Sequence, residues 1–329
     1  MPTILSRRTV TLAIAAAAMP AIAPAVAQTD DWPKQPIKFI VPFPPGGTVD
    51  PVARILQKQI TDATGWNIIV DNRPGAGGSI GTAAAAKSPA DGYTWVVVFD
   101  THAVNPSLLP NMTFDTLKDL APVMLVGTSP MAVVTPPGRP FKTFGDVVTA
   151  AKAKPDTITY GSIGNGSLGH LTLTLVQQAG DFRIVHVPYK GGGPMTQDVI
   201  AGQIDLAIGT VALLTPQIQA GKVRALAVTG DKRSPVLPDV PSLAEQGFPN
   251  FSALAWWGVL APTGTPKAIQ DRMHAELAKA LAQPAVRKQL GEQLGMDLVV
   301  STPAQFNTFL GEQVARWGKV VRDNNIKPD

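Results

Sequence analysis

Residues 37–56 read IKFIVPFPPGGTVDPVARIL, which combines an apolar run, a glycine-rich turn and the start of a helical pattern. The apolar run 37–43 suits a buried strand, and Val52, Ile55, Leu56 and Ile60 mark one helical face. The same order of apolar run, turn and helical segment is repeated along the chain. Further strands are predicted at residues 68–70, 94–99, 131–135, 157–162, 184–187, 206–208, 223–228 and 254–261. Repeated units of this kind predict an α/β fold with mostly parallel sheets flanked by helices.

The length and the placement of turns predict two lobes. A chain of 329 residues with 45% hydrophobic residues buries a large core and ordinarily divides into two domains. Strong breakers stand at 135–138 (TPPG) and 261–266 (APTGTP), so the chain is expected to cross between the lobes near 127 and again near 255. The predicted first lobe comprises residues 28–127 and 252–329, and the second comprises residues 128–251. Two such crossings would form a hinge.

The first 27 residues have the pattern of a signal peptide. Arg7 and Arg8 give a basic start, residues 10–18 are apolar, and Ala25-Val26-Ala27 suits a cleavage site. The arginine pair is compatible with the general secretory route and with the twin-arginine route. The chain has no Cys, which excludes a lipid-anchored N-terminal Cys and a disulfide framework. No later segment reaches ~20 uninterrupted apolar residues, so the expected location is the periplasm.

The charge pattern excludes nucleic acid as a partner. The formal net charge of +4 falls to +2 without Arg7 and Arg8, and no basic run exceeds a pair such as Lys232-Arg233. Nucleic-acid binding needs a denser cluster of cations.

Four glycine-rich turns precede predicted helices, two in each expected lobe. In the first turn Asp50 suits the helix N-cap and Pro51 the first helical position. In the second turn Ser79 is the expected cap. The candidate ligand-binding residues of the four turns are Pro44, Pro45, Gly46, Gly47, Thr48 and Asp50; Gly75, Ala76, Gly77, Gly78 and Ser79; Ser162, Gly164, Asn165, Gly166 and Ser167; and Lys190, Gly191 and Gly192.

The chemistry shared by these turns suits an anion. Glycine lets the backbone approach a ligand closely, and the first turn of a helix has unpaired N–H groups with partial positive charge. Each helix terminus contributes roughly 0.3–2 kcal/mol to anion binding, whereas micromolar binding needs about 8 kcal/mol. One glycine turn is commonly structural, but four of them favour a binding cleft. The remaining binding free energy, beyond that of the helix termini, would come from charge-assisted hydrogen bonds, burial of the ligand's apolar body and ordered water.

Other chemistries find little support in the sequence. GNGSLG at 164–169 matches a dinucleotide fingerprint, yet no acidic residue ends the next strand to hold a ribose, so NAD is not expected. The four histidines lack metal-ligand spacing, and there is neither a Cys nucleophile nor a GxSxG motif. No cofactor, metal or catalytic residue is therefore predicted. His102 and His170 follow strand ends and join the candidate ligand-binding residues, whereas His186 is expected to be packed or exposed.

Read together, these segments resemble the Bug family, the periplasmic solute receptors of tripartite tricarboxylate transporters. The resemblance covers essentially the whole mature chain. The stretches that carry it are WP at 32–33, PI at 36–37, VPF at 41–43 with Gly46-Gly47 and Asp50, AR at 53–54, DNRPGAGG at 71–78, DGYT at 91–94, PYKG at 188–191, GQID at 202–205, AGKVRALA at 220–227 and WGVLAP at 257–262.

The resemblance implies a two-lobed, type II periplasmic binding fold that closes on its ligand. It implies that a ligand carboxylate is held largely by backbone amides and bridging waters in loops that match residues 44–48 and 75–79. Segments that match 162–167 and 190–192 would hold the other end of the ligand. The implied partner is a set of membrane permease subunits, and a monomeric receptor is expected.

Two departures from the family pattern bear on the ligand. Many members carry an acidic residue shortly after the strand that matches 206–208, whereas this chain has Gly209 and Thr210, which join the candidate ligand-binding residues. In addition, proline stands at Pro44 or Pro45 in place of a small residue. Loss of the acid removes a partner for a ligand's amino group. The predicted ligand is thus an aliphatic or aromatic dicarboxylate, including a terephthalate-like acid, and not an amino acid.

Some alternatives remain open at this level. Phe99, Trp256 and Trp257 either form an apolar wall for an aromatic ligand or pack the hinge. The protein could instead serve a sensor kinase, or be a lyase or transferase on the same two-lobed fold.

Overall fold

The computed structural model describes residues 32–249 and 251–328. The signal peptide predicted at 1–27 lies outside the described residues. The predicted strand, turn and helix unit at the start is confirmed: β1 (Ile37–Val41) leads through a loop into α1 (Asp50–Thr64). Val52, Leu56 and Ile60 of α1 are buried, as their spacing predicted.

The first part of the chain continues with β2 (Ile68–Asn72), η1 (Ala76–Gly78), α2 (Ser79–Ala86), β3 (Thr94–Phe99) and α3 (Thr101–Leu108). The long strand β4 (Leu120–Thr135) follows. The middle of the chain contains α4 (Phe144–Ala153), β5 (Thr159–Ser162), α5 (Leu168–Gly180), β6 (Val185–Pro188), α6 (Gly192–Ile200), β7 (Leu206–Thr210), α7 (Val211–Gln219), β8 (Arg224–Val228) and η2 (Ala244–Gln246). The last part contains β9 (Leu254–Pro262), α8 (Lys267–Ala282), α9 (Pro284–Arg287), η3 (Lys288–Gln293), β10 (Asp297–Leu298) and α10 (Pro303–Asp323).

The strands form one mixed sheet in the order β2-β1-β3-β9-β4-β7-β5-β6, with β8 and β10 also paired to β4. The ladders of β1 with β2 and β3 are parallel, and so are those of β5 with β6 and β7. Between these parallel groups, β4 and β9 run antiparallel to each other and to their neighbours. The predicted α/β architecture is confirmed, with parallel ladders at both ends and antiparallel strands at the centre.

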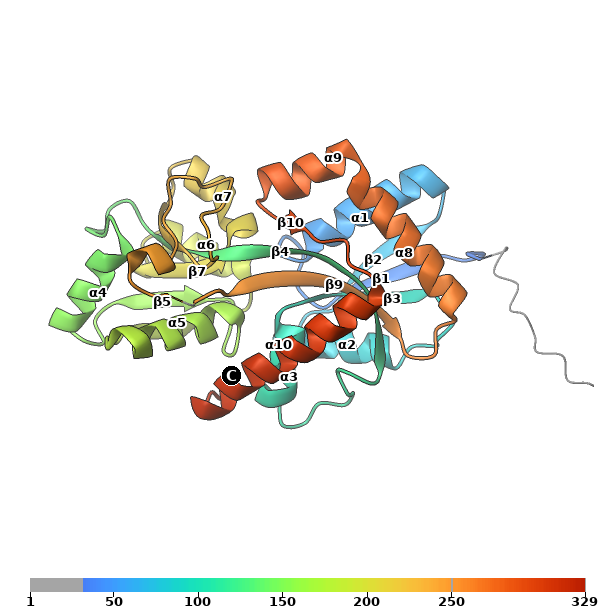
Figure 1. The fold of residues 1–329 in the computed structure, drawn as a ribbon, viewed down its shortest axis with the longest axis horizontal. Helices are drawn as coiled ribbons and strands as arrows, with labels where there is room; N and C mark the ends of the chain where they lie inside the picture. The colour runs from blue at the N-terminus through green and yellow to red at the C-terminus, as the bar shows by residue number, and fades with distance from the viewer. Residues whose placement is uncertain (1–31, 250, 329) are drawn as a thin grey trace, which may run out of the picture. The chain divides into compact units, whose positions relative to one another are not determined.

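β4 and β9 connect the two halves of the fold (Figure 1). Residues 120–130 of β4 pair with β9, whereas residues 131–134 pair with β7, the next strand in the sheet. The sequence predicted only residues 131–135 as a strand, because Pro122, Gly127 and Pro130 interrupt the first part of β4. The lobe boundaries near 127 and 252 stay a prediction, since residues 33–329 form one unit by their contacts.

Each half has its own apolar core. One cluster includes Val96, Val98, Trp256 and Phe306, which brings the C-terminal helix α10 onto the sheet of the first half. The other includes Val134, Met195, Ala207 and Leu214 and lies among α6, α7 and the strands of the second half. The predicted return of the C-terminal helices to the first lobe stays a prediction, as do the lobe boundaries.

Two helix caps differ from the prediction. The N-cap of α1 is Val49, and Asp50 is the first helical residue; its carboxylate accepts from Arg54 of the same helix and from Asn72 of β2. The N-cap of α2 is Gly78 with a φ of 93°, so Ser79 stands inside the helix and makes no cap hydrogen bond. Glycine tolerates this left-handed conformation at no steric cost, which explains why it takes the cap position in place of serine.

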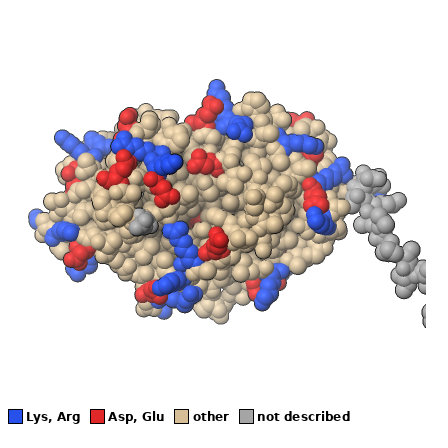
Figure 2. All heavy atoms as spheres, viewed as in Figure 1, with Lys and Arg blue, Asp and Glu red and all other residues tan. Residues whose placement is uncertain are grey.

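The surface carries both signs of charge. Figure 2 shows Lys and Arg interspersed with Asp and Glu on the visible face, without a continuous basic area. Within residues 32–249 and 251–328, no helix combines the length and the apolar character needed to cross a membrane.

Candidate functional site

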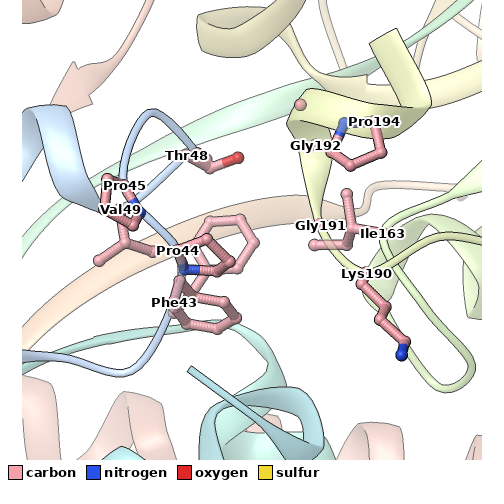
Figure 3. A pocket seen from close by; sticks show the side chains of 13 residues that line it. Phe43, Pro44, Pro45, Thr48, Val49, Ile163, Lys190, Gly191, Gly192 and Pro194 are labelled. Atoms are coloured by element: carbon pink, nitrogen blue, oxygen red, sulfur yellow. The ribbon is translucent and has the colours of Figure 1, made fainter. Parts of the chain in front are cut away.

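A cavity with a volume of about 60 Å³ lies between the two halves of the fold, where loops from each half face one another (Figure 3). One side, the lobe 1 wall, consists of the loop between β1 and α1 together with the end of β3. The other side, the lobe 2 wall, consists of the start of α6 with the residue that follows β5. The lining residues are Phe43, Pro44, Pro45, Gly47, Thr48, Val49 and Phe99 on the lobe 1 wall, and Ile163, Lys190, Gly191, Gly192, Gly193 and Pro194 on the lobe 2 wall.

Aromatic rings make the lobe 1 wall apolar and fix its position. The rings of Phe43 and Phe99 meet edge to face with their centroids 6.0 Å apart. Trp257 packs behind Phe99 at 5.2 Å, and its indole N–H donates to the carbonyl of Thr48 at 3.1 Å. Trp256 instead packs against Phe306 in the core. Of the three aromatic residues considered from the sequence, Phe99 lines the cavity and Trp257 supports it from behind.

Residues 44–47 of the lobe 1 wall offer no unbonded backbone N–H group to the cavity. Pro44 and Pro45 have no N–H group. The N–H of Gly46 donates to the Asp50 carboxylate at 3.3 Å, and that of Gly47 to the carbonyl of Pro44 at 3.4 Å. The hydroxyl of Thr48 points toward the opposite wall (Figure 3). The polar side chain of this wall is therefore a single neutral hydroxyl.

Asp50 braces the loop between β1 and α1. The residue is 4% exposed, and its carboxylate accepts hydrogen bonds from Arg54 Nε and Asn72 Nδ2, both at 2.9 Å, besides the N–H of Gly46. Burial acts to raise the pKa of Asp50, but these three donors outweigh it and hold the pKa below its ordinary value. The carboxylate thus stays charged and also occupies the positive end of α1.

The lobe 2 wall has the opposite character. Lys190 is exposed and makes no ion pair with any residue of the described chain, 32–249 and 251–328. Gly191, the N-cap of α6, has a φ of 106° and supplies no side-chain cap, and the first turn of α6 carries no acidic residue. The unpaired N–H groups of that turn and the Lys190 ammonium give this wall a positive character.

The third glycine turn lies beside the cavity, but only Ile163 of that turn lines it. Ser162 is buried at the centre of a hydrogen-bond cluster: its hydroxyl contacts Ser167 Oγ at 3.1 Å and His186 Nε2 at 2.7 Å. Ser167 also caps α5. Gly164 bonds to Ser162 through its N–H and its carbonyl, whereas Asn165 is partly exposed.

Two stacked histidines hold this third turn. The rings of His170 and His186 lie 3.9 Å apart, and the N–H of Gly166 donates to His170 Nδ1 at 3.0 Å. Burial, followed by the neighbouring His170, lowers the pKa of His186 to about 3. A Cβ on Gly166 would meet Leu108 Cδ2 at 2.3 Å, so glycine permits α3 and this turn to touch. The histidines therefore position the turn and do not line the cavity.

The second glycine turn is placed apart from the cavity. Ala76 and Ser79 border a separate groove with Ile80, which is 57% exposed. The carbonyl of Gly77 accepts from Thr101 Oγ at 2.8 Å and from Asn105 Nδ2 at 3.1 Å, which ties the turn to α3. Neither Gly75 nor Gly78 lines the cavity.

Three further candidates also lie away from it. His102 is 3% exposed, stacks on Phe114 and has its Nε2 without a hydrogen-bond partner; burial lowers its pKa to about 3. Gly209 is packed against Met195 and Leu214, and Thr210 caps α7 by accepting from the N–H of Leu213 at 3.1 Å. These placements suit the core and the helix end.

The structure therefore brings together Pro44, Pro45, Gly47, Thr48, Lys190, Gly191 and Gly192 out of the predicted set. Sequence reasoning missed Phe43, Val49, Ile163, Gly193 and Pro194 as lining residues. Their signal was position alone, since each adjoins a glycine-rich turn. The search for polar and glycine residues passed over the apolar ones.

Comparisons with known proteins place the chain among solute-binding proteins. Residues 52–326 match the model of the tripartite tricarboxylate transporter family receptor. Protein BugT of Bordetella pertussis is 38% identical over 300 residues, which cover 91% of this chain and 92% of that protein. The structure of Rpa4515 from R. palustris with adipate covers 91% of this chain and all of its own, with 33% identity and a TM-score of 0.87. MatC from Rhodopseudomonas palustris with bound malate covers 88% of this chain and all of its own, with 30% identity and a TM-score of 0.82.

Proposed function

Because the chain belongs to the family of tripartite tricarboxylate transporter receptors, we propose that it captures a small carboxylate between its lobes and delivers it to the permease subunits of such a transporter. Its fold is that of a two-lobed periplasmic binding protein, and the family consists of solute-binding receptors, not enzymes. The permease partner, a monomeric state and export by the signal at 1–27, through the secretory or the twin-arginine route, belong to the proposal.

The observation that carries the proposal is the cation at the cavity. Lys190 is the one charged residue among those that line the cavity, and it has no acidic partner within the described residues. A carboxylate forms charge-assisted hydrogen bonds with an ammonium group and with the N–H groups at a helix start. A bound carboxylate would supply the partner that the fold itself does not.

The lining also supports a ligand without an amine. Among the residues that the structure describes, no Asp or Glu lines the cavity, and the nearby Asp50 is already bonded to Arg54 and Asn72. An ammonium group of a ligand would lose its hydration there without an anionic partner. Adipate in Rpa4515 and malate in MatC are amine-free dicarboxylates. We therefore favour aliphatic or aromatic dicarboxylates, a terephthalate-like acid included.

The proposed mechanism is a shift of population toward the closed form. A ligand that touches both walls binds the closed form more tightly than the open one, and this difference in affinity drives closure. The permease subunits would then recognise the closed form.

A thermal-shift screen tests the proposal. The purified protein, unfolded and refolded to remove any copurified ligand, is heated with mono-, di- and tricarboxylates, aromatic acids and amino acids. A ligand present at 100 times its Kd stabilises the folded state by about 2.7 kcal/mol, which raises the melting temperature. We expect selective rises with amine-free carboxylates. A rise with aspartate or glutamate larger than with any amine-free acid of the same length would contradict the ligand class.

A further inference from the structure

We propose that Asn165 is a site of self-catalysed modification, at which its side-chain amide is converted to a carboxylate with His170 as the base. Asn165 and Gly166 form the one Asn-Gly pair of the sequence, and they lie in the third glycine turn, between β5 and α5. The modification itself is independent of the proposed function. Its effect on ligand capture rests on that function.

The Asn165 side chain is available for reaction. The residue is partly exposed, and its amide makes no hydrogen bond to any residue within 32–249 and 251–328. Gly166 has no side chain to shield its backbone nitrogen from Cγ of Asn165, so the two atoms approach each other more easily than they would with a bulkier residue at 166. Attack of this nitrogen on Cγ closes a five-membered ring.

His170 places a base at the reacting nitrogen. The N–H of Gly166 donates to His170 Nδ1 at 3.0 Å, so this ring nitrogen carries no proton and lies within the reach that a general base needs. His186 stacks on the His170 ring at 3.9 Å and is itself held by Ser162 Oγ at 2.7 Å. Burial, followed by the neighbouring His170, lowers the pKa of His186 to about 3, so this neighbour stays neutral and does not repel a proton that reaches His170.

The proposed reaction balances with water as its co-reactant. His170 Nδ1 takes the proton of the Gly166 nitrogen while that nitrogen forms a bond to Cγ of Asn165. The bond from Cγ to the side-chain nitrogen then breaks, and the proton passes from His170 to this leaving group, which departs as ammonia. Water opens the resulting succinimide ring at either carbonyl, which gives aspartate or isoaspartate at position 165.

Either product would disturb the contact between this turn and α3. A Cβ on Gly166 would meet Leu108 Cδ2 at 2.3 Å, so the turn has no spare room against α3. Isoaspartate inserts one extra atom into the main chain directly before Gly166. Both products also add a negative charge two residues from Ile163, which lines the cavity. Because α3 packs in the core of the first half and the turn belongs to the second, we expect the modification to hinder closure and to repel a carboxylate.

Peptide mapping by mass spectrometry tests the modification. The purified protein and a synthetic peptide of residues 160–172 are incubated together at neutral pH, and conversion of the amide is followed over time. General-base catalysis contributes typically 10²–10⁴-fold, so we expect Asn165 to react at least about tenfold faster in the folded protein than in the peptide. Asn111, which is exposed and precedes Met112, is an internal reference and should remain an amide. A rate in the folded protein at or below that in the peptide would overturn the inference.

Two histidine variants test the role of the base. His170→Phe keeps a flat ring against His186 but lacks Nδ1, so the rate at Asn165 should fall about tenfold or more. His274→Phe makes the same exchange on α8 and should leave the rate unchanged. Rates are compared well below the melting temperature of each variant. An unchanged or faster rate in folded His170→Phe would overturn the assignment of His170 as the base.

Calorimetry tests the effect on ligand capture. Fresh and aged wild type are titrated with succinate, malate and adipate, alongside Asn165→Gln aged in the same way, because glutamine keeps the amide and closes the ring far more slowly. We expect full conversion to weaken binding roughly tenfold in the wild type, and the affinity of Asn165→Gln to stay constant. Equal affinities of fresh and converted wild type would overturn the effect on capture. Absence of binding by the fresh protein would contradict the proposed function and that effect with it, whereas the mass spectra decide on the modification alone.

Discussion

The loops that precede α1 and α6 look alike in sequence, since each follows a strand, contains adjacent glycines and ends at a helix. They differ in one acidic residue. Asp50 occupies the first turn of α1 and accepts from the N–H of Gly46, whereas α6 begins with Gly192 and Gly193 and carries no acid in its first turn. A glycine turn at a helix start is thus open to an anion only when its own chain has not already placed a carboxylate there.

The largest expected effect on carboxylate binding comes from giving the loop before α6 the acidic residue that the loop before α1 has. Gly193→Asp puts a carboxylate at the start of α6, beside Lys190, and a Cβ at this position meets nothing within 4 Å. The new acid would pair with Lys190 and repel the ligand's carboxylate, so we expect carboxylate affinity to fall about 100-fold or more, close to 3 kcal/mol. Calorimetry measures this loss. The neutral Gly193→Asn variant should retain most of the affinity, and an equal loss in both variants would contradict the electrostatic explanation.

One buried and one partly buried histidine allow the halves to be compared under acid. Burial holds the pKa of His102 near 3, below its unfolded value of about 6.5, so the unfolded chain binds the proton first. Above pH 6.5, His102 therefore does not lower the free energy of unfolding. As the pH falls from 6.5 toward 3, it lowers that free energy, by about 3 kcal/mol at pH 4. His102→Phe keeps a flat ring against Phe114 and should melt with less dependence on pH in this range.

Melting curves at pH 7, 5.5 and 4 measure the difference. His186 should behave differently on substitution, because its Nε2 contacts Ser162 and His102 Nε2 has no partner. His186→Phe is expected to lower the melting temperature already at pH 7. Parallel pH profiles for wild type and His102→Phe would show that this histidine does not cause the acid sensitivity.

Asp50→Asn tests the brace of the first loop. The substitution removes the charge that accepts from Arg54 and Asn72, so we expect the free energy of unfolding to fall by about 1–3 kcal/mol at pH 7. Because the pKa of Asp50 is lowered in the folded state, its contribution is full above the unfolded value of about 3.9 and disappears as pH falls through the folded value. Urea titrations at pH 7 and at pH 3 should show a smaller difference between the proteins at pH 3. An unchanged difference would contradict the role of the charge.

The smallest expected effect concerns the glycines themselves. Gly46 has a φ of 73° and Gly191 a φ of 106°, and a Cβ would meet nothing within 4 Å at either position. The first lies in the left-handed region, where alanine loses about 1 kcal/mol, and the second in a region that is almost confined to glycine. Gly191→Ala should therefore lower the melting temperature more than Gly46→Ala does. Equal melting temperatures would show that the second loop relaxes.

Local patterns predicted the elements well, and distant contacts explain what they missed. The apolar runs gave the positions of β1, β3 and β9 closely, because burial on both faces of a central strand demands apolar residues. The first part of β4 was not predicted as a strand, because proline, here Pro122 and Pro130, is unfavourable inside a strand. The structure accommodates Pro122 at a shift of register against β9.

The site was predicted in part for the same reason. Lys190, Gly191 and Thr48 line the cavity, since each belongs to a turn at the end of a strand, and their contact with a ligand stays a prediction. The role of Asp50 could not be inferred, because its partner Asn72 lies on β2, in another element of the sheet. The turn at 75–79 was expected at the same site, yet hydrogen bonds to α3 place it beside a different groove.

The shared strand β4 limits how binding proteins of this shape can be recombined. Its first part belongs to the ladder with β9, and its last part pairs with β7 and β8 in the other half. An exchange of one whole lobe between two relatives would pair β4 of one protein with neighbouring strands of the other, at the centre of the sheet. Substitution in the short loops at 44–48 and 190–194 leaves those ladders intact. Ligand preference is thus more readily changed by substitutions in these loops than by the exchange of a lobe.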